Sequence, residues 1–156
     1  MFQFDTEQKV CEVGWVKFGW QPGEYPTVTC SSIFQKGHKV FEGKRKEGVG
    51  EKKAAGLLQT QDGLWQETGV AGMADIVANT GDEFKTYIDF VTSVSDMPFC
   101  IDAWVMKPKL EGAAYCAEKG LLDRMFYNSL TIWEKDLETE IKEIADIGVK
   151  HVLLVA

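Results

Sequence analysis

Apolar and polar residues alternate along residues 8–19, and Gly14 stands in the middle of this run. Alternation with a period of two is typical of strands that are buried on one face, so the run predicts a β-hairpin. Residues 21–26 then hold two prolines and a glycine, which predict a turn. We therefore expect residues 1–26 to form an N-terminal hairpin and a turn segment.

Residues 27–156 repeat another pattern, in which a short apolar run is followed by a longer segment with apolar residues at helical spacing. The runs predict strands and the longer segments predict helices. The expected strands cover residues 27–33, 70–77, 99–103, 125–128 and 151–156. The expected helices cover residues 51–68, 109–119 and 137–147, and another begins at Thr80 and continues at least to Val94. Glu83 stands three residues after Thr80, which is the spacing of a capping box.

Alternating strands and helices of this kind predict a parallel sheet with right-handed crossover connections, built by residues 27–156 as repeated βα units. Two architectures fit the pattern. One is an open five-stranded flavodoxin-like sheet, and the other is the first half of a (β/α)8 TIM barrel, which typically has about 250 residues. In the barrel, the strand of residues 151–156 would be left as an unpaired edge. The pattern alone therefore favours the open sheet. With either architecture, we expect residues 1–156 to form a single α/β domain or half-barrel.

One segment departs from the repeat. Residues 35–50 form a long polar loop with four glycines and His38. Loops of this length in compact domains are often functional, which makes this a candidate binding or lid loop. His38 is a possible ligand contact within it, although a lone loop histidine is more often solvated surface.

The charge balance narrows the class of partner. The chain has 156 residues, of which 45% are hydrophobic, and its formal net charge is −7 at neutral pH. Nucleic acid and membrane surfaces attract clustered positive charge, so the acidic balance disfavours both as the main partner. No apolar run approaches the ~20 residues of a spanning helix, and the N-terminus lacks the features of a signal peptide. We expect no direct membrane span.

The four cysteines are widely scattered, and no two of them form a C-x-x-C pair. The chain also has only two histidines. This usage predicts reduced thiols, a cytoplasmic location and no bound metal.

Two polar side chains stand where predicted strands end. Asp102 lies at the end of the strand of residues 99–103, and Asn128 ends the strand of residues 125–128. Parallel α/β proteins bind their ligands at the carboxyl ends of the strands, so the pair predicts a site for a polar ligand. Asp75, in the strand of residues 70–77, is either a second ligand contact or a buried polar group with partners in the core.

Several longer motifs are more specific. They are Phe4-Asp5, Glu7-Gln8, Gly19, Gln21-Pro-Gly-Glu-Tyr-Pro-Thr27, Ser32-Ile-Phe34, Gly37-His-Lys-Val40, Tyr87-Ile-Asp-Phe-Val91, Pro98-Phe99, Ile101-Asp102 and Tyr127-Asn-Ser129. In this order they resemble the H subunit of tetrahydromethanopterin S-methyltransferase. They also resemble the bacterial methyltetrahydrofolate:corrinoid-protein methyltransferases, and the resemblance extends from the N-terminus to the last strand.

That family has a (β/α)8 barrel fold, is usually dimeric, and is about twice as long as this chain. The resemblance therefore implies the first half of a TIM barrel, preceded by a hairpin, in preference to the open sheet. It implies a methyltransferase that moves a methyl group from a methyl-tetrahydropterin to the Co(I) of a corrinoid protein. The pterin would be methyltetrahydrofolate or methyltetrahydromethanopterin, and the cobalamin or other corrinoid would be carried by the partner. A homodimer, or a complex with other methyltransferase subunits, is also implied.

The resemblance assigns roles to the strand-end residues. Asp102 matches the family's strand-end aspartate and would anchor the pterin, because a carboxylate accepts hydrogen bonds from adjacent N–H and amino donors at once. Asn128 matches the strand-end asparagine and would assist the methylated nitrogen as charge develops there. The further contacts implied are Asp75 and Ser129 for the pterin, and His38 and Ser32 as possible loop contacts.

Three tryptophans depart from the family pattern. Trp104 stands where a small hydroxyl residue is usual, and it could stack on the pterin or fill the site. Trp15 and Trp20 stand where glycine is expected. These departures motivate an alternative function, a non-catalytic subunit or fragment that docks a corrinoid protein or a partner subunit. A stand-alone flavodoxin-like domain would need flavin or phosphate binding, for which the loops hold no motif.

Overall fold

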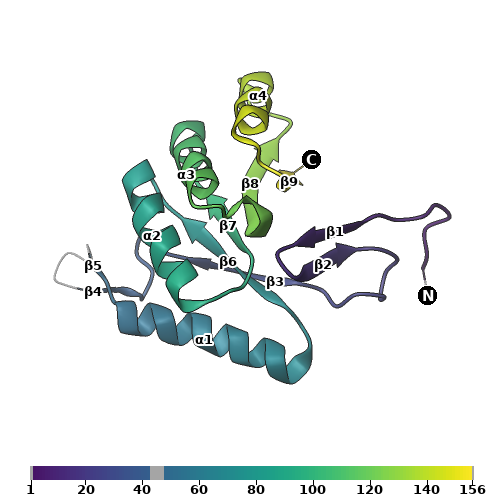
Figure 1. Cartoon of the computed structure of the whole chain (residues 1–156), viewed down its shortest axis with the longest axis horizontal. Helices are drawn as coiled ribbons and strands as arrows, with labels where there is room; N and C mark the ends of the chain where they lie inside the picture. The colour runs from purple at the N-terminus through teal and green to yellow at the C-terminus, as the bar shows by residue number, and fades with distance from the viewer. Residues whose placement is uncertain (1, 43–47, 156) are drawn as a thin grey trace.

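The structure is a computed structural model that describes residues 2–42 and 48–155 (Figure 1). It begins with the predicted hairpin, in which β1 (Val10–Val13) pairs antiparallel with β2 (Val16–Gly19). At the turn, Gly14 has a φ of 60°, a conformation that favours glycine. The hairpin prediction is confirmed.

Five parallel strands form the central sheet. They are β3 (Thr29–Ile33), β6 (Gly72–Val77), β7 (Phe99–Asp102), β8 (Met125–Thr131) and β9 (Val152–Val155). Their order in the sheet is their order in the chain, and every neighbouring pair is parallel. A flavodoxin-like sheet has the order 2-1-3-4-5, with a reversal at its switch point, whereas consecutive strands of a (β/α)8 barrel are neighbours. The predicted α/β fold is confirmed, and its strand order is that of a half-barrel.

Four helices connect the strands: α1 (Glu51–Thr68), α2 (Gly81–Val94), α3 (Met106–Glu118) and α4 (Leu137–Ile147). Both α1 and α4 begin and end at the predicted residues. Each helix ends before a glycine with a left-handed backbone conformation, Gly69 or Gly148. The hydroxyl of Thr80 accepts a hydrogen bond from the Glu83 N–H, as the capping box predicts. A short 3-10 helix, η1 (Leu122–Arg124), precedes β8.

All four helices pack on one face of the sheet (Figure 1). The core on that face takes alternate residues from the strands, such as Ile76, Ile101 and Tyr127, which stand level with one another in β6, β7 and β8. The helix residues of the same buried cluster are Ala54, Leu58, Phe84, Tyr87, Ile88, Val91, Ala113, Cys116 and Ile144. Helices on a single face, combined with a sequential strand order, are typical of the outer layer of a barrel.

The hairpin covers the other face near the amino ends of the strands. Val13 packs there against Met73, Cys100 and Phe126 in a second buried cluster. Side chains alternate between the two faces of a strand, so every second residue of each strand belongs to this face. Toward the carboxyl ends of the strands, the residues on this face include polar side chains. The hairpin thus leaves the carboxyl end of this face uncovered.

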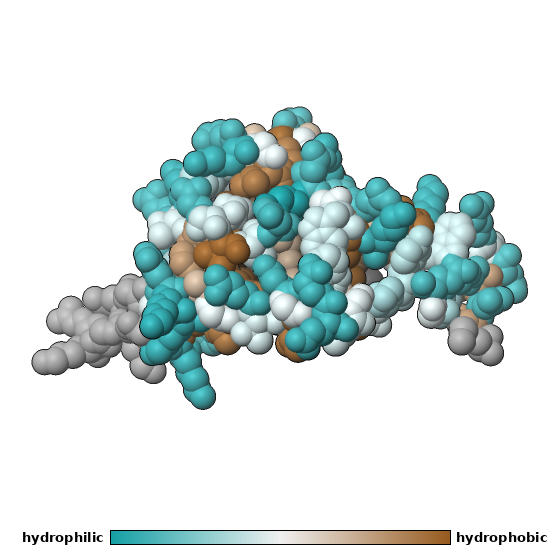
Figure 2. Space-filling view, turned by 60° about the horizontal axis from the view of Figure 1, so that its bottom comes forward, coloured by the Kyte–Doolittle hydropathy of each residue, from teal (hydrophilic) through white to brown (hydrophobic). Residues whose placement is uncertain are grey.

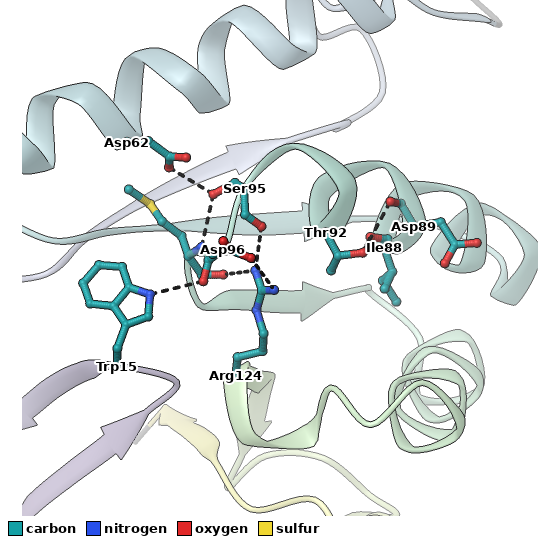
Figure 3. Close-up of polar contacts among 9 residues, drawn as sticks. Trp15, Asp62, Ile88, Asp89, Thr92, Ser95, Asp96 and Arg124 are labelled. Carbon is teal, nitrogen blue, oxygen red and sulfur yellow. Dashed lines mark hydrogen bonds and ion pairs between the residues drawn. The ribbon is translucent and has the colours of Figure 1, made fainter.

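A hydrogen-bonded cluster fastens the hairpin to the sheet (Figure 3). The guanidinium Nη2 of Arg124 donates to the carbonyls of Ser95 and Met97, both at 2.7 Å. The Ser95 hydroxyl donates to Asp62 of α1 at 3.0 Å, and the indole of Trp15 donates to a backbone carbonyl of the same connection at 3.3 Å. The cluster therefore joins the hairpin, α1, the α2–β7 connection and η1 at the amino end of the sheet.

Two expectations need correction. The helix predicted to begin at Lys109 begins at Met106. The strand predicted to end at Asn128 continues to Thr131, so Asn128 lies within β8 and not at its end. β8 continues because Leu130 and Thr131 pair with β9, beyond a shift in register that follows Asn128.

The long polar loop also contains structure. β4 (Phe41–Glu42) and β5 (Gly48–Val49) form a two-residue antiparallel pair, and Phe41 is partly buried against the main core. Residues 43–47 of the predicted loop lie outside the described residues.

Hydrophobic surface is divided into patches among hydrophilic side chains on the face shown in Figure 2. Within residues 2–42 and 48–155, no helix combines the length and apolar character needed to cross a bilayer.

Candidate ligand site at the carboxyl ends of the strands

Three of the predicted site residues form one hydrogen-bonded row on the face away from the helices. The Ser32 hydroxyl of β3 donates to Asp75 Oδ2 of β6 at 2.9 Å, and the Asn128 amide of β8 donates to Asp75 Oδ1 at 3.0 Å. Asp75 is only 5% exposed. A buried carboxylate needs hydrogen-bond partners, and each oxygen of Asp75 has one.

Asp102 stands next to this row. It pairs in register with Asn128 on one side and with Val77 on the other. Partial burial raises the pKa of its carboxyl, and the negative charge of Asp75 raises it further, while the Lys109 ammonium lowers it. Two carboxylates and one amide thus share a small, partly desolvated region.

Asp102 and Ser129 also line a polar cavity of about 200 Å³ between the strand ends and the starts of α3 and α4. The other residues around it are Ala103, Trp104, Met106, Lys109, Thr131, Glu134 and Glu140. Trp104 borders this cavity but is 91% exposed, so its ring does not fill the site.

Two of the lining residues form a buried ion pair that the sequence did not single out. Lys109 Nζ of α3 lies 3.1 Å from Glu140 Oε1 of α4, and their side chains are 8% and 4% exposed. The hydroxyl of Tyr127 donates to the same Glu140 oxygen at 2.6 Å. Helical spacing could have revealed the lysine, because Lys109, Ala113 and Cys116 fall on one face at i, i+4 and i+7.

His38 lies elsewhere. It lines a larger cavity of about 670 Å³ between β3 and α1, which is mostly apolar and contains Leu57, Leu58 and Leu64. Its Nδ1 is buried and has no hydrogen-bond partner among the described residues. Ser32 borders this cavity as well, but Asp102 and Asn128 do not. Among the predicted site residues, the larger cavity thus contains His38 and Ser32, whereas Asp102 and Ser129 line the smaller polar cavity.

The two hairpin tryptophans do not enter the site. Trp20 has a φ of 69°, a left-handed conformation that favours glycine, which agrees with the expectation of glycine at this position. The ring of Trp15 packs on that of Trp65 of α1, with centroids 4.2 Å apart. Both positions lie on the hairpin, which covers the amino end of the sheet.

In the described part of the chain, no group of three or more histidine, cysteine, aspartate or glutamate residues is arranged to hold a metal ion. All four cysteines are free thiols. The polar site consists of carboxylate, amide and hydroxyl groups, which are suited to hydrogen-bond a polar organic ligand.

Comparison with known proteins shows to which family this chain belongs. The model of the tetrahydromethanopterin S-methyltransferase MtrH subunit matches residues 6–155. The H subunit of tetrahydromethanopterin S-methyltransferase from Methanothermobacter thermautotrophicus is 38% identical over 154 residues, which is 98% of this chain and 49% of that protein. The corresponding protein of Methanosarcina barkeri is 37% identical over 98% of this chain and 49% of its own length. That of Methanopyrus kandleri is 38% identical over 88% of this chain and 43% of its own.

The chain spans about half the length of the curated relatives that it matches. The match covers the hairpin and all the βα units described above. The chain belongs to the MtrH subunit family of tetrahydromethanopterin S-methyltransferases.

Proposed function

We propose that this chain carries part of the site at which a methyl group leaves a methyl-tetrahydropterin for the Co(I) of a corrinoid protein. The observation that carries the proposal is the row Ser32–Asp75–Asn128, with Asp102 beside it, at the carboxyl end of the sheet. The names of the relatives point to tetrahydromethanopterin as the pterin. Methyltetrahydromethanopterin is therefore the preferred donor, ahead of methyltetrahydrofolate.

Asp102 anchors the pterin in this proposal. A pterin presents adjacent N–H and amino donors, and a carboxylate can accept from both. Asp75 already accepts from Ser32 and Asn128, whereas Asp102 lines an open polar cavity. Of the two carboxylates, Asp102 is thus the one with acceptor sites directed to a ligand.

Asn128 assists the reacting nitrogen. Its side-chain NH2 has two hydrogens, and the bond to Asp75 uses one of them, so the second can point to the pterin. Asp75 acts on the reaction indirectly, because its carboxylate fixes the orientation of the Asn128 amide. A donor that is already oriented before the reaction stabilises developing charge at little reorganisation cost.

The chemistry explains why such a donor is needed. Co(I) supplies both electrons of the new carbon–cobalt bond, and the pterin nitrogen keeps the electron pair of the bond that breaks. The nitrogen then takes up a proton and becomes an N–H group. A hydrogen bond that strengthens as negative charge grows on this nitrogen lowers the barrier, and not merely the substrate's dissociation constant.

The size of the polar cavity indicates that further protein surface contacts the pterin. Ligand pockets usually measure about 300–1,000 Å³, whereas the polar cavity of this chain measures about 200 Å³. Further surface must therefore enclose the pterin. We propose that this surface comes from the other barrel units of the complete protein, and that the corrinoid protein approaches over the same end. Assembly as a homodimer or with other methyltransferase subunits, and a cytoplasmic location suggested by the free thiols, belong to the same proposal.

One observation favours a second candidate, a subunit that docks a corrinoid protein without catalysis. Large apolar side chains are exposed in the two connections that follow β7 and β8: Trp104 at 91%, Val105 at 61%, Ile132 at 57% and Trp133 at 69%. Exposed apolar groups at the rim of a site are typical of protein–protein contacts.

The loss of the cob(I)alamin visible spectrum on mixing with methyltetrahydromethanopterin separates the two candidates. Turnover by the parent, slowed on the order of 10²-fold by Asn128→Ala, supports the methyltransferase. Binding to a corrinoid protein with no loss of Co(I) supports the docking role. An Asn128→Ala variant that turns over as fast as the parent overturns the role of Asn128.

A further inference from the structure

The buried ion pair Lys109–Glu140 lies directly behind the proposed reacting residue. Its side chains are 8% and 4% exposed, and burying charge is costly unless each charge is paired and hydrogen-bonded. Such a pair is weak support for stability, because apolar residues of similar volume often serve as well. The pair therefore invites a functional explanation.

The lysine makes a second contact that leads to the site. Its ammonium donates to the Ser129 carbonyl at 2.8 Å and lies 4.7 Å from the centre of the Tyr127 ring. Tyr127 in turn donates to Glu140. The network thus holds the residue before Asn128 through its side chain and the residue after it through its carbonyl.

The pairing of β8 with β9 is irregular at Ser129. The register of β8 with β9 pairs Asn128 with Leu153 and Leu130 with Leu154, which leaves Ser129 as the extra residue of a bulge. An extra residue in a bulge lacks its place in the ladder, and bulges commonly redirect a neighbouring side chain at functional sites. Lys109 donates a hydrogen bond to the Ser129 carbonyl at this irregular position.

We propose that Lys109, neutralised by Glu140, is a positioning residue that fixes the bulge at Ser129 and so aims the Asn128 amide at Asp75 and the ligand. Lys109 does not touch the reacting atoms and acts through Asn128. The link to methyl transfer rests on the proposed function, whereas the effect on the Asn128 amide does not.

The test uses a double variant, Lys109→Met with Glu140→Gln, which removes both charges together and leaves none buried alone. Its first readout is the side-chain amide of Asn128 in NMR, assigned by its absence in Asn128→Ala. We expect these signals to shift and their exchange with water to accelerate by at least about tenfold, because the amide loses its fixed partner. Lys107→Met, on the same helix with a side chain 83% exposed, should leave them unchanged.

The second readout is single-turnover methyl transfer. At a pterin concentration that saturates each protein, we expect the double variant to transfer the methyl group at least about tenfold more slowly, since misplacement of a catalytic group is costly. The single variant Lys109→Arg keeps a donor for the Ser129 carbonyl, so it should transfer the methyl group faster than the double variant does. If the parent itself transfers no methyl group, the proposed function fails, and the NMR readout still decides the positioning role.

Unchanged Asn128 signals in the folded double variant would overturn the proposal. Should that variant not fold, Lys109→Met with Glu140→Leu replaces the pair by apolar groups, and the same NMR criterion applies. If both variants fail to fold, the network serves folding alone and the positioning role is overturned.

Discussion

Asn128 and Asp75 belong to strands that are not neighbours, yet the amide nitrogen of one lies 3.0 Å from a carboxylate oxygen of the other. The bond spans β7, the strand between them, in which Cys100 pairs in register with Asp75 and Asp102 pairs in register with Asn128. The two side chains therefore depend on each other for their orientation, and loss of one should be felt by the other.

Replacing Asp75 by alanine should destabilise the fold by about 1–3 kcal/mol. The change removes the acceptor for both Ser32 and Asn128 and leaves two part-buried donors unpaired. Urea unfolding of the variant measures the loss. Asp5→Ala, an exposed aspartate near the N-terminus, should stay within about 0.5 kcal/mol of the parent. Equal stability of the Asp75 variant and the parent would show that the row makes no net contribution.

Asp102→Asn should make the protein slightly more stable at pH 7. Burial and the charge of Asp75 raise the pKa of the Asp102 carboxyl in the folded state. The folded state thus holds the charged form at a cost, which appears as pH rises from the unfolded pKa through the folded pKa. Because the group is only partly buried, the gain should be less than about 1 kcal/mol.

The pH dependence provides the control for Asp102→Asn. Below about pH 3 the carboxyl is almost fully protonated in the folded and unfolded chains alike, so the stability difference should disappear. Urea unfolding at several pH values measures this. A variant that is less stable than the parent at pH 7, with the gap closing in acid, would mean that the charged carboxylate stabilises the fold.

Arg124→Met should lower the free energy of unfolding by about 2–4 kcal/mol. The substitution removes two short hydrogen bonds to the carbonyls of Ser95 and Met97 and leaves both acceptors without this donor (Figure 3). Thermal unfolding measures the loss. Lys17→Met, in the hairpin with a side chain 50% exposed, serves as the surface control. A loss no larger than that of the control would contradict a stabilising role for the hydrogen-bonded cluster at the amino end of the sheet.

Thiol alkylation should distinguish Cys30 from Cys116. The neighbouring Cys100 thiol lowers the pKa of the exposed Cys30 thiol, whereas burial raises the pKa of Cys116 to about 12. Only the thiolate reacts, so iodoacetamide at pH 8 should modify Cys30 rapidly and Cys116 only after unfolding. Peptide mass mapping over time measures both rates. Modification of Cys116 in the folded protein as fast as that of Cys30 would contradict the packing of α3.

The sequence located the elements whose ends carry a local signal. The bounds of α1 and α4 were predicted because a left-handed glycine ends each helix, and the start of α2 because Thr80 caps it. The start of α3 was missed because Val105 provides no side-chain cap. Capping residues mark a boundary within a few positions of the chain, and without them the boundary depends on packing.

The site was predictable in part. The strand pattern was enough to place Asp102 and Asn128 near one edge of the sheet, whereas it left Asp75 open as a ligand contact or a buried polar group. The bulge at Ser129 and the continuation of β8 were not predictable, because they arise from the pairing with β9. The ion pair of Lys109 and Glu140 joins two different helices, so no local pattern relates one residue to the other.

The central claim is that Asp102 anchors a methyl-tetrahydropterin at the carboxyl end of the sheet. Calorimetric titration with methyltetrahydromethanopterin tests it most directly, comparing the parent with Asp102→Ala and with Asp146→Ala, an exposed aspartate of α4. We predict that Asp102→Ala weakens binding by at least tenfold, about 1.4 kcal/mol, and that Asp146→Ala binds as the parent does. Equal affinity of the parent and the Asp102 variant would contradict the claim.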